Sequence, residues 1–146
     1  MRSIIPFAAV DAKTRLASVL DTDERAAFSR AMLDAVVETV IEAGHEPTVL
    51  STAPLDEPTR PASTSVVVDD RPLTTAVNDQ LAADSPTLIV MADLPLATAD
   101  DIHRLTESNA DVTLAPGLGG GTNAIVVREP AFRVDYHGAS YLDHRA

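Results

Sequence analysis

One apolar run, Leu88 to Ala92, constrains the fold of this chain more than any other feature. It has no polar residue on either face, which is typical of a strand inside a parallel sheet that helices cover on both sides. Pro95 lacks an N–H group and ends the strand. Ligands of open α/β sheets bind beyond the carboxyl ends of the strands, so Asp93 is predicted to lie where it can hold a phosphate-bound cation. The simpler alternative is that Asp93 only caps the turn into the next helix.

Hydrophobic periodicity in the rest of the chain predicts strands and helices in alternation. Further strands are expected at Ser3–Phe7, Pro47–Ser51, Val66–Val68, Val112–Pro116 and Ala124–Val127. A long helix is expected from a capping box at Asp21–Glu24 to a stop at Gly44, with an apolar stripe of Phe28, Met32, Leu33, Val36, Val37, Val40 and Ile41. Shorter helices are expected from a first turn at Pro72, with Leu73, Val77 and Leu81 on one face, and from a capping box at Thr98–Asp101, with Ile102 and Leu105 facing inward. This order predicts a Rossmann-like, three-layer α/β/α fold with a mostly parallel sheet and right-handed crossovers.

Length and composition limit the class of protein. The 146 residues suffice for one core, so residues 1–146 are expected to form a single domain. No stretch approaches the roughly 20 apolar residues that span a bilayer, and the chain starts directly with a strand instead of a signal peptide. A cytoplasmic protein with no membrane partner is therefore expected. Because the chain has no cysteine, any metal must be held by oxygen or histidine ligands.

The net charge of −11 argues against binding to a nucleic acid backbone. Asp and Glu total 22, and of the 11 basic residues only Lys13 is a lysine. Such a surface is typical of adaptation to high salt, where counterions screen the repulsion between carboxylates. An acidic protein from a low-salt host is the simpler alternative.

The acidic surface leads to a prediction about salt. We expect the midpoint of thermal unfolding to rise between dilute buffer and molar KCl, because screening removes repulsion that favours the expanded chain. Thermal unfolding followed by circular dichroism at both salt concentrations measures this. An unchanged midpoint would contradict the adaptation to high salt.

A cationic segment, Lys13-Thr14-Arg15, follows the first predicted strand. At that edge of the sheet, Arg15 can bind a polyphosphate through its planar fork, and Lys13 can bind it as a point charge. In a chain that otherwise uses arginine, the single lysine is expected to have a function that arginine cannot fill. An ordinary solvated loop is an equally simple interpretation of this segment taken alone.

Two further segments near the C-terminal end can bind anions. The glycine-rich stretch before Thr122 and Asn123 can present backbone N–H groups as an anion nest, with hydrogen bonds added by these two side chains. It has neither the dinucleotide-binding nor the Walker spacing, and a flexible hairpin turn is the alternative. A small-residue turn at Gly138 precedes a short helix from Ser140, whose N–H groups can bind a second anion. His137 and His144 have no metal-ligand spacing and are interpreted as surface residues.

Five segments in this order resemble the motifs of the CofC family of 2-phospho-L-lactate guanylyltransferases, and the resemblance covers essentially the whole chain. They are Lys13–Leu16, Asp69–Leu73, Met91–Pro95, Gly119–Asn123 and Gly138–Ser140. The resemblance implies a MobA-like nucleotidyltransferase that passes GMP from GTP to the phosphate of 2-phospho-L-lactate or phosphoenolpyruvate and releases pyrophosphate, in biosynthesis of the deazaflavin coenzyme F-420. It also implies a source among halophilic archaea.

The resemblance, together with the chemistry of the residues themselves, leads to expected functions for individual positions. Asp93 is expected to bind magnesium across the phosphates, and Lys13 and Arg15 to neutralise the pyrophosphate, so these three form the expected catalytic set. Pro6 is placed at the nucleotide together with Lys13 and Arg15, and either Asp70 or Asn78 is expected to contact the nucleoside. The acceptor is expected to be held by four residues, Thr122, Asn123, Gly138 and Ser140.

The chain departs from the family pattern in two ways. Family members commonly have a lysine where this chain has Ala8, and they continue for several tens of residues past the helix at Ser140, including a further metal-binding aspartate. The chain is therefore expected to lack the C-terminal portion of the domain. A MobA-like enzyme with a molybdopterin or sugar phosphate acceptor and a GTP-binding module without turnover stay open as alternatives, as does a homodimer.

Overall fold

The computed structural model describes residues 1–9, 22–55, 64–81, 85–94, 96–117 and 121–136. Its strands form one six-stranded sheet in the order β3-β2-β1-β4-β6-β5. The strands are β1 (Arg2–Phe7), β2 (Glu46–Ser51), β3 (Ser65–Val68), β4 (Thr87–Val90), β5 (Val112–Pro116) and β6 (Thr122–Val127). The helices of the described part are α1 (Thr22–Glu42), α2 (Leu73–Gln80) and α3 (Ala99–Glu107).

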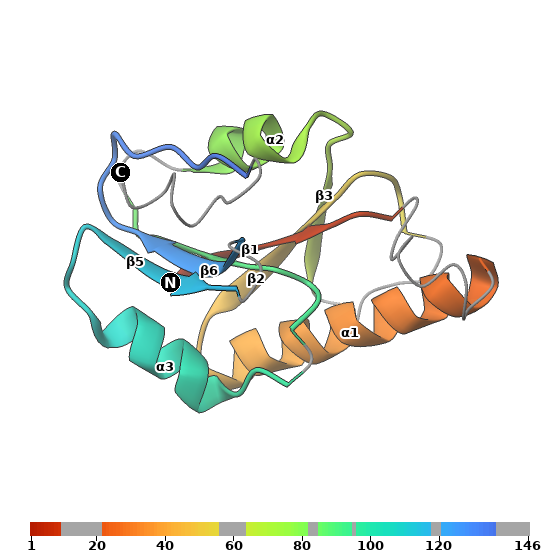
Figure 1. Ribbon diagram of the computed structural model, residues 1–146, viewed down its shortest axis with the longest axis horizontal. Coiled ribbons are helices and arrows are strands. Elements are labelled where there is room, and N and C mark those ends of the chain that lie inside the picture. Colours follow the sequence, from red (N-terminus) through yellow and green to blue (C-terminus); the bar gives the residue numbers. More distant parts are fainter. Residues whose placement is uncertain (10–21, 56–63, 82–84, 95, 118–120, 137–146) are drawn as a thin grey trace.

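Helices cover both faces of the sheet, as Figure 1 shows, with α1 and α3 on one face and α2 on the other. Each face has its own core: Leu33 of α1 and Ile102 of α3 pack on one side, and Val77 of α2 packs on the other. All four residues of β4 are buried, because both layers cover this strand. The predicted three-layer α/β/α fold is therefore confirmed.

The sheet is mostly parallel, with one exception. β3, β2, β1 and β4 run parallel to one another, whereas β6 runs antiparallel to both β4 and β5. The predicted alternation of strands and helices is wrong at this point, because β5 and β6 form a hairpin around the glycine-rich stretch. A hairpin reverses the chain within a few residues, whereas a parallel pair needs a long crossover.

The apolar stripe of α1 is buried along its middle line and exposed at its two edges. Met32, Leu33, Val36, Val37 and Val40 are buried, but Phe28 is 45% and Ile41 is 40% exposed, so their predicted burial is wrong. Position along the helix does not explain this exposure, because Ser29, next to Phe28, and Ala43, beyond Ile41, are buried. At about 100° per residue, Phe28 and Ile41 instead lie at the two opposite edges of the stripe, where the helix surface turns away from the sheet. Gly44, with φ of 88°, follows the last turn of α1 and ends the helix as predicted.

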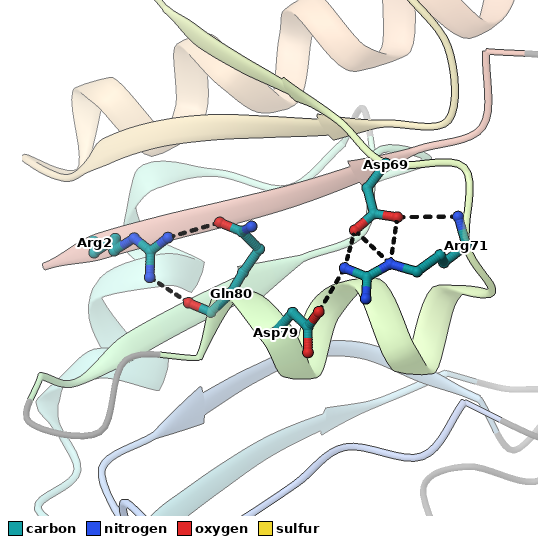
Figure 2. A network of polar contacts seen from close by, with 5 residues as sticks. All are labelled: Arg2, Asp69, Arg71, Asp79 and Gln80. Atoms are coloured by element: carbon teal, nitrogen blue, oxygen red, sulfur yellow. Dashed lines mark hydrogen bonds and ion pairs between the residues drawn. The ribbon is translucent and has the colours of Figure 1, made fainter.

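Hydrogen bonds from other parts of the fold anchor α2 to the sheet. The Arg2 guanidinium donates to the backbone oxygen of Gln80 and to its Oε1, the latter at 2.9 Å (Figure 2). Asn78 donates from Nδ2 to the Val134 oxygen at 3.0 Å and accepts at Oδ1 from the Val134 N–H at 2.8 Å. Pro72 is the N-cap of α2 and lies just before the first turn in which it was predicted. The capping box of α3 is confirmed, with Thr98 and Asp101 bonded reciprocally.

The paired bonds of Asn78 lead to a stability prediction. Asn78→Ala is expected to lower the free energy of unfolding by about 1–3 kcal/mol, because both polar groups of the buried Val134 lose their partner. Denaturant unfolding measures this, with Asn109→Ala at an exposed position as the matched control. If the variant were as stable as the unchanged protein but did not bind nucleotide, this result would support the earlier prediction that Asn78 contacts the nucleoside.

No helix in the described ranges is long and apolar enough to cross a membrane.

Candidate active site

A cavity of about 280 Å³ lies at the carboxyl ends of the parallel strands. Its walls come from the ends of β1, β2, β3 and β4, together with the sheet-facing side of α1 and the start of α2. Pro6 and Phe7 of β1 line it, as do Asp69, directly after β3, and Asp93, three residues after β4. This is the edge at which α/β sheets bind ligands, because the strand order there opens a crevice.

Asp93 lies at the boundary between this cavity and a second one. It follows β4, is exposed, and contributes to the walls of both cavities. The second cavity, of about 670 Å³, lies on the α3 side of the sheet and is lined mainly by apolar residues such as Val90, Ile102 and Ala124. A carboxylate shared by two neighbouring cavities can interact with a ligand in each of them.

Asn123 contributes to the second cavity through an irregularity in the hairpin. The register between β5 and β6 shifts at Ala115 and Pro116, whose partners are Ala124 and Thr122, so Asn123 is the extra residue of a bulge. A bulge redirects a side chain relative to the regular alternation, and Asn123 lines the cavity beside Ala124. Its backbone oxygen accepts the Met91 N–H at 3.0 Å, which holds the bulge against the chain leading to Asp93.

Glycine at position 117 leaves the space that this asparagine occupies. A Cβ at Gly117 would lie 3.0 Å from Oδ1 of Asn123. Thr122, the other acceptor residue predicted from this stretch, is buried at the start of β6 and is not among the residues that line either cavity.

An ion-pair chain, Asp69–Arg71–Asp79, runs from the wall of the first cavity to α2 (Figure 2). Arg71 donates to Asp69 from Nε at 2.9 Å, from Nη2 at 2.6 Å and from its backbone N–H at 3.0 Å. The same Nη2 lies 2.5 Å from Oδ2 of Asp79. These ion pairs thus connect the end of β3 to the last turn of α2.

The cavity is lined by Asp69, whereas the sequence pointed to Asp70. Successive residues after a strand point to opposite sides, so a shift of one position exchanges the inward and outward residue. The Asp69 side chain is 11% exposed, and Asp70 is exposed and does not line the cavity. Asn78 does not line it either, since its amide is bonded to Val134.

Arg71 lowers the pKa of the carboxyl group of Asp69. Its side-chain hydrogen bonds, followed by its backbone N–H, lower the pKa of Asp69 to about 2. The carboxylates of Asp69 and then Asp79 raise the pKa of Arg71 above its ordinary value. The pKa of Asp69 and that of Arg71 therefore both move further from neutrality, so this pair stays charged at neutral pH.

The lowered pKa leads to a prediction about acid. A carboxyl group whose pKa is depressed by folding stabilises the folded state above its ordinary pKa of 3.8 and loses this contribution as the pH falls towards 2. A carbon-13 titration should place the Asp69 midpoint near 2, and Arg71→Gln should return it to the ordinary range. A midpoint near 4 in the unchanged protein would contradict the pairing.

Ser29 is a residue of the first cavity that the sequence analysis missed. It lies on α1, is 3% exposed and lines the cavity, and its hydroxyl has no hydrogen-bond partner among the described residues. A buried hydroxyl without a partner is costly, which favours a ligand that supplies one. A serine within the apolar stripe, one turn before Met32 and Leu33, was the available signal.

Four predicted site residues lie outside the described residues. They are Lys13, Arg15, Gly138 and Ser140. His137 and His144 also lie outside the described residues.

The described residues contain no cluster of three or more histidine, cysteine, aspartate or glutamate side chains that could hold a metal ion. A magnesium ion does not need such a cluster, because one or two carboxylates plus substrate phosphates and water commonly hold it. Asp93 is exposed at the junction of the two cavities and is suited to such a site.

Comparison with known proteins identifies the family. The family model described as "Guanylyl transferase CofC like" matches residues 1–146. The chain belongs to the CofC family. Curated relatives include the 2-phospho-L-lactate guanylyltransferases of Haloterrigena turkmenica, 55% identical over 162 residues, and Haloarcula marismortui, 56% identical over 150 residues. Each comparison covers 99% of this chain and 70% of the relative. The expected family and its occurrence in halophilic archaea are thus confirmed, and a nucleotidyltransferase family of this kind generally requires a divalent metal ion.

Solved structures confirm the fold of this CofC-family chain. A protein of Desulfovibrio desulfuricans named as a nucleotide-diphospho-sugar transferase superimposes with a TM-score of 0.72 at 17% identity, covering 90% of this chain and 64% of its own. A transferase structure from Thermus thermophilus gives a TM-score of 0.56 at 19% identity, covering 87% of this chain and 65% of its own.

Proposed function

We propose that this chain is a guanylyltransferase that transfers GMP from GTP to 2-phospho-L-lactate, with phosphoenolpyruvate as the alternative acceptor. Membership of the CofC family and the names of its relatives support the reaction. The structural observation that carries the proposal is the position of Asp93, which lines two adjoining cavities. A transferase needs two substrates to meet at one charged centre, and this junction is such a place.

The first cavity is the proposed nucleotide site. Its ends are polar, with Asp93 at β4 and Asp69 at β3, and residues such as Phe7, Leu50 and Met91 make its middle apolar. Adjacent strands lie about 4.8 Å apart, so the three spacings between β3 and β4 separate the two ends by roughly 14 Å. We assign the phosphates to the Asp93 end, and the base to the Asp69 end, with the buried Ser29 hydroxyl available to the nucleotide between them.

The acceptor is assigned to the other side of Asp93. Asn123 lines that side, and Thr122 lies next to it at the start of β6. Gly138 and Ser140 are proposed to complete this site, as the resemblance implied. Small polar groups of this kind suit a three-carbon phospho-acid, because they can bind its phosphate and carboxylate oxygens without excluding them sterically.

The reaction requires positioning and charge neutralisation more than acid–base chemistry. The acceptor phosphate is anionic at neutral pH, so it needs no general base. Lys13 and Arg15 are proposed to neutralise the departing pyrophosphate. Asp93 is proposed to hold magnesium, which supplies positive charge to the phosphates.

A turnover assay on the purified chain in high salt tests the proposal. Pyrophosphate release is measured for GTP with 2-phospho-L-lactate, phosphoenolpyruvate or a sugar phosphate, and GTP binding with magnesium is measured calorimetrically on the same sample. Turnover with a three-carbon phospho-acid is the expected result. Turnover with a sugar phosphate alone would contradict the three-carbon phospho-acid as acceptor and favour the sugar phosphate instead. GTP binding without turnover would favour a binding module. Failure to bind GTP would contradict the nucleotide site itself.

A further inference from the structure

Ser29 is a buried serine of α1 whose hydroxyl is not explained by the packing of the helix. The residue is 3% exposed, and its oxygen has no hydrogen-bond partner among the described residues. Alanine would fill the same place without an unsatisfied hydroxyl, and it has a higher helix propensity than serine. For folding alone serine is therefore the worse choice at this position, which indicates that the hydroxyl binds a ligand.

The hydroxyl of Ser29 can reach the first cavity, the proposed nucleotide site. Ser29 lines this cavity together with Met32, which lies one turn further along α1. A serine side chain consists only of Cβ and Oγ, and rotation about one bond carries Oγ between staggered positions. A serine that lines a cavity can therefore turn its hydroxyl into that cavity without any movement of the helix.

Ser29 lies over the middle of the first cavity and not at either end. Asp69, at one end, directly follows β3, and Asp93, at the other end, lies beyond β4. In the sheet order β2 and β1 lie between these two strands, and among the strands α1 packs mainly on β2 and β1 (Figure 1). Ser29 is therefore between the part of the cavity assigned to the base and the part assigned to the phosphates.

The polar side chains in this middle part of the cavity are two hydroxyl groups. Ser29 contributes one, and Thr52, which directly follows β2, contributes the other. Oγ1 of Thr52 accepts the Ala9 N–H at 3.0 Å, so the proton of this hydroxyl remains for another acceptor. The other described residues that line the cavity on α1 and at the ends of β1 and β2 are apolar, namely Pro6, Phe7, Ala8, Met32 and Leu50.

The part of a ribonucleotide between the base and the phosphates is the ribose, whose hydroxyl groups both donate and accept hydrogen bonds. A serine hydroxyl is also a donor and an acceptor, so it can bind a ribose hydroxyl in either direction. We propose that Ser29 binds a ribose hydroxyl of the nucleotide and thereby selects ribonucleotides, with Thr52 placed to bind the second ribose hydroxyl. This inference rests on the proposed nucleotide site and adds a residue that distinguishes the sugar.

Equilibrium binding of GTP and 2′,3′-dideoxyGTP, each with magnesium, tests the inference on the 146-residue chain in constant high salt. The dideoxynucleotide keeps the base and the triphosphate but lacks both ribose hydroxyls. The unchanged protein should bind it roughly 10-fold more weakly than GTP, because two hydrogen bonds are lost and Ser29 stays without a partner. Equal affinities for the two nucleotides would overturn the inference.

Ser29→Ala removes the proposed partner of the ribose. The ratio of GTP to dideoxyGTP affinity should fall about 3-fold through weaker binding of GTP, with the affinity for dideoxyGTP unchanged. Ser3→Ala, which removes a fully buried hydroxyl outside both cavities, is the matched control and should keep the ratio of the unchanged protein. An unchanged ratio in Ser29→Ala, or equal weakening of both nucleotides, would overturn the inference.

The stability of Ser29→Ala separates binding of a ligand from a structural function. Because the hydroxyl has no partner among the described residues, the midpoint of denaturant unfolding without nucleotide should stay unchanged or rise. A lower midpoint would assign the hydroxyl to the fold and overturn the inference. If the unchanged protein binds neither nucleotide, the proposed nucleotide site fails, whereas GTP binding with the same ratio in Ser29→Ala overturns the inference alone.

Discussion

Asp93→Asn is expected to lower turnover roughly 10³-fold or more and to remove the dependence of turnover on magnesium. The substitution keeps the shape of the side chain but removes the charge that is proposed to hold the metal ion at the phosphates, and such charge stabilisation contributes several kcal/mol to a transition state. Rates of pyrophosphate release over a range of magnesium concentrations measure both effects.

The control for this variant is Asp100→Asn, which removes an exposed carboxylate from the first turn of α3 and touches neither cavity. Circular dichroism of both variants verifies that they fold. Near-normal turnover of Asp93→Asn would favour the simpler interpretation, in which Asp93 only caps the turn into α3.

Lys13→Ala is expected to lower turnover by roughly 10²-fold, the size of effect found when one charge contact to a transition state is removed. Its charge is proposed to neutralise the pyrophosphate as it leaves, so kcat should fall more than the affinity for GTP. Stopped assays at saturating GTP give kcat, and calorimetry gives the affinity.

Lys13→Arg provides the sharper comparison, since it keeps the positive charge but replaces the compact ammonium group with a planar guanidinium. If this chain retains one lysine because arginine cannot replace it, Lys13→Arg should also lose most of the activity. Normal activity in Lys13→Ala would contradict the argument from the single lysine and would leave Arg15 to neutralise the pyrophosphate alone.

Features that depend on neighbouring residues in the chain could be predicted from the sequence. The burial of β4 followed from its continuous apolar run, and the start of α3 followed from the spacing of Thr98 and Asp101. The end of α1 followed from Gly44, because a glycine tolerates the positive φ that stops a helix there. The position of Asp93 beside a cavity followed from the rule that parallel sheets bind ligands at one edge.

Features that depend on the meeting of distant segments required the structure. Asn78 looked available for a ligand, but Val134, which lies 56 residues further along the chain, occupies its amide. Ser29 could not be assigned to the cavity from the sequence, since the strands that complete its surroundings come from other parts of the chain.

The sequence by itself therefore determined the elements, the layered class of the fold and the edge of the sheet at which the nucleotide site is proposed, because helical and strand periodicity, caps and turns are local properties of the chain. The tertiary structure decided which side chains reach that edge. It selected Asp69 over Asp70, turned Asn123 towards the second cavity through a bulge, and held Arg71 between two carboxylates from different elements. A shift of one residue exchanges the side chains that point to the two faces of a sheet. The local sequence pattern beyond a strand does not fix this choice, so only the packed structure shows which residue of a neighbouring pair faces the cavity.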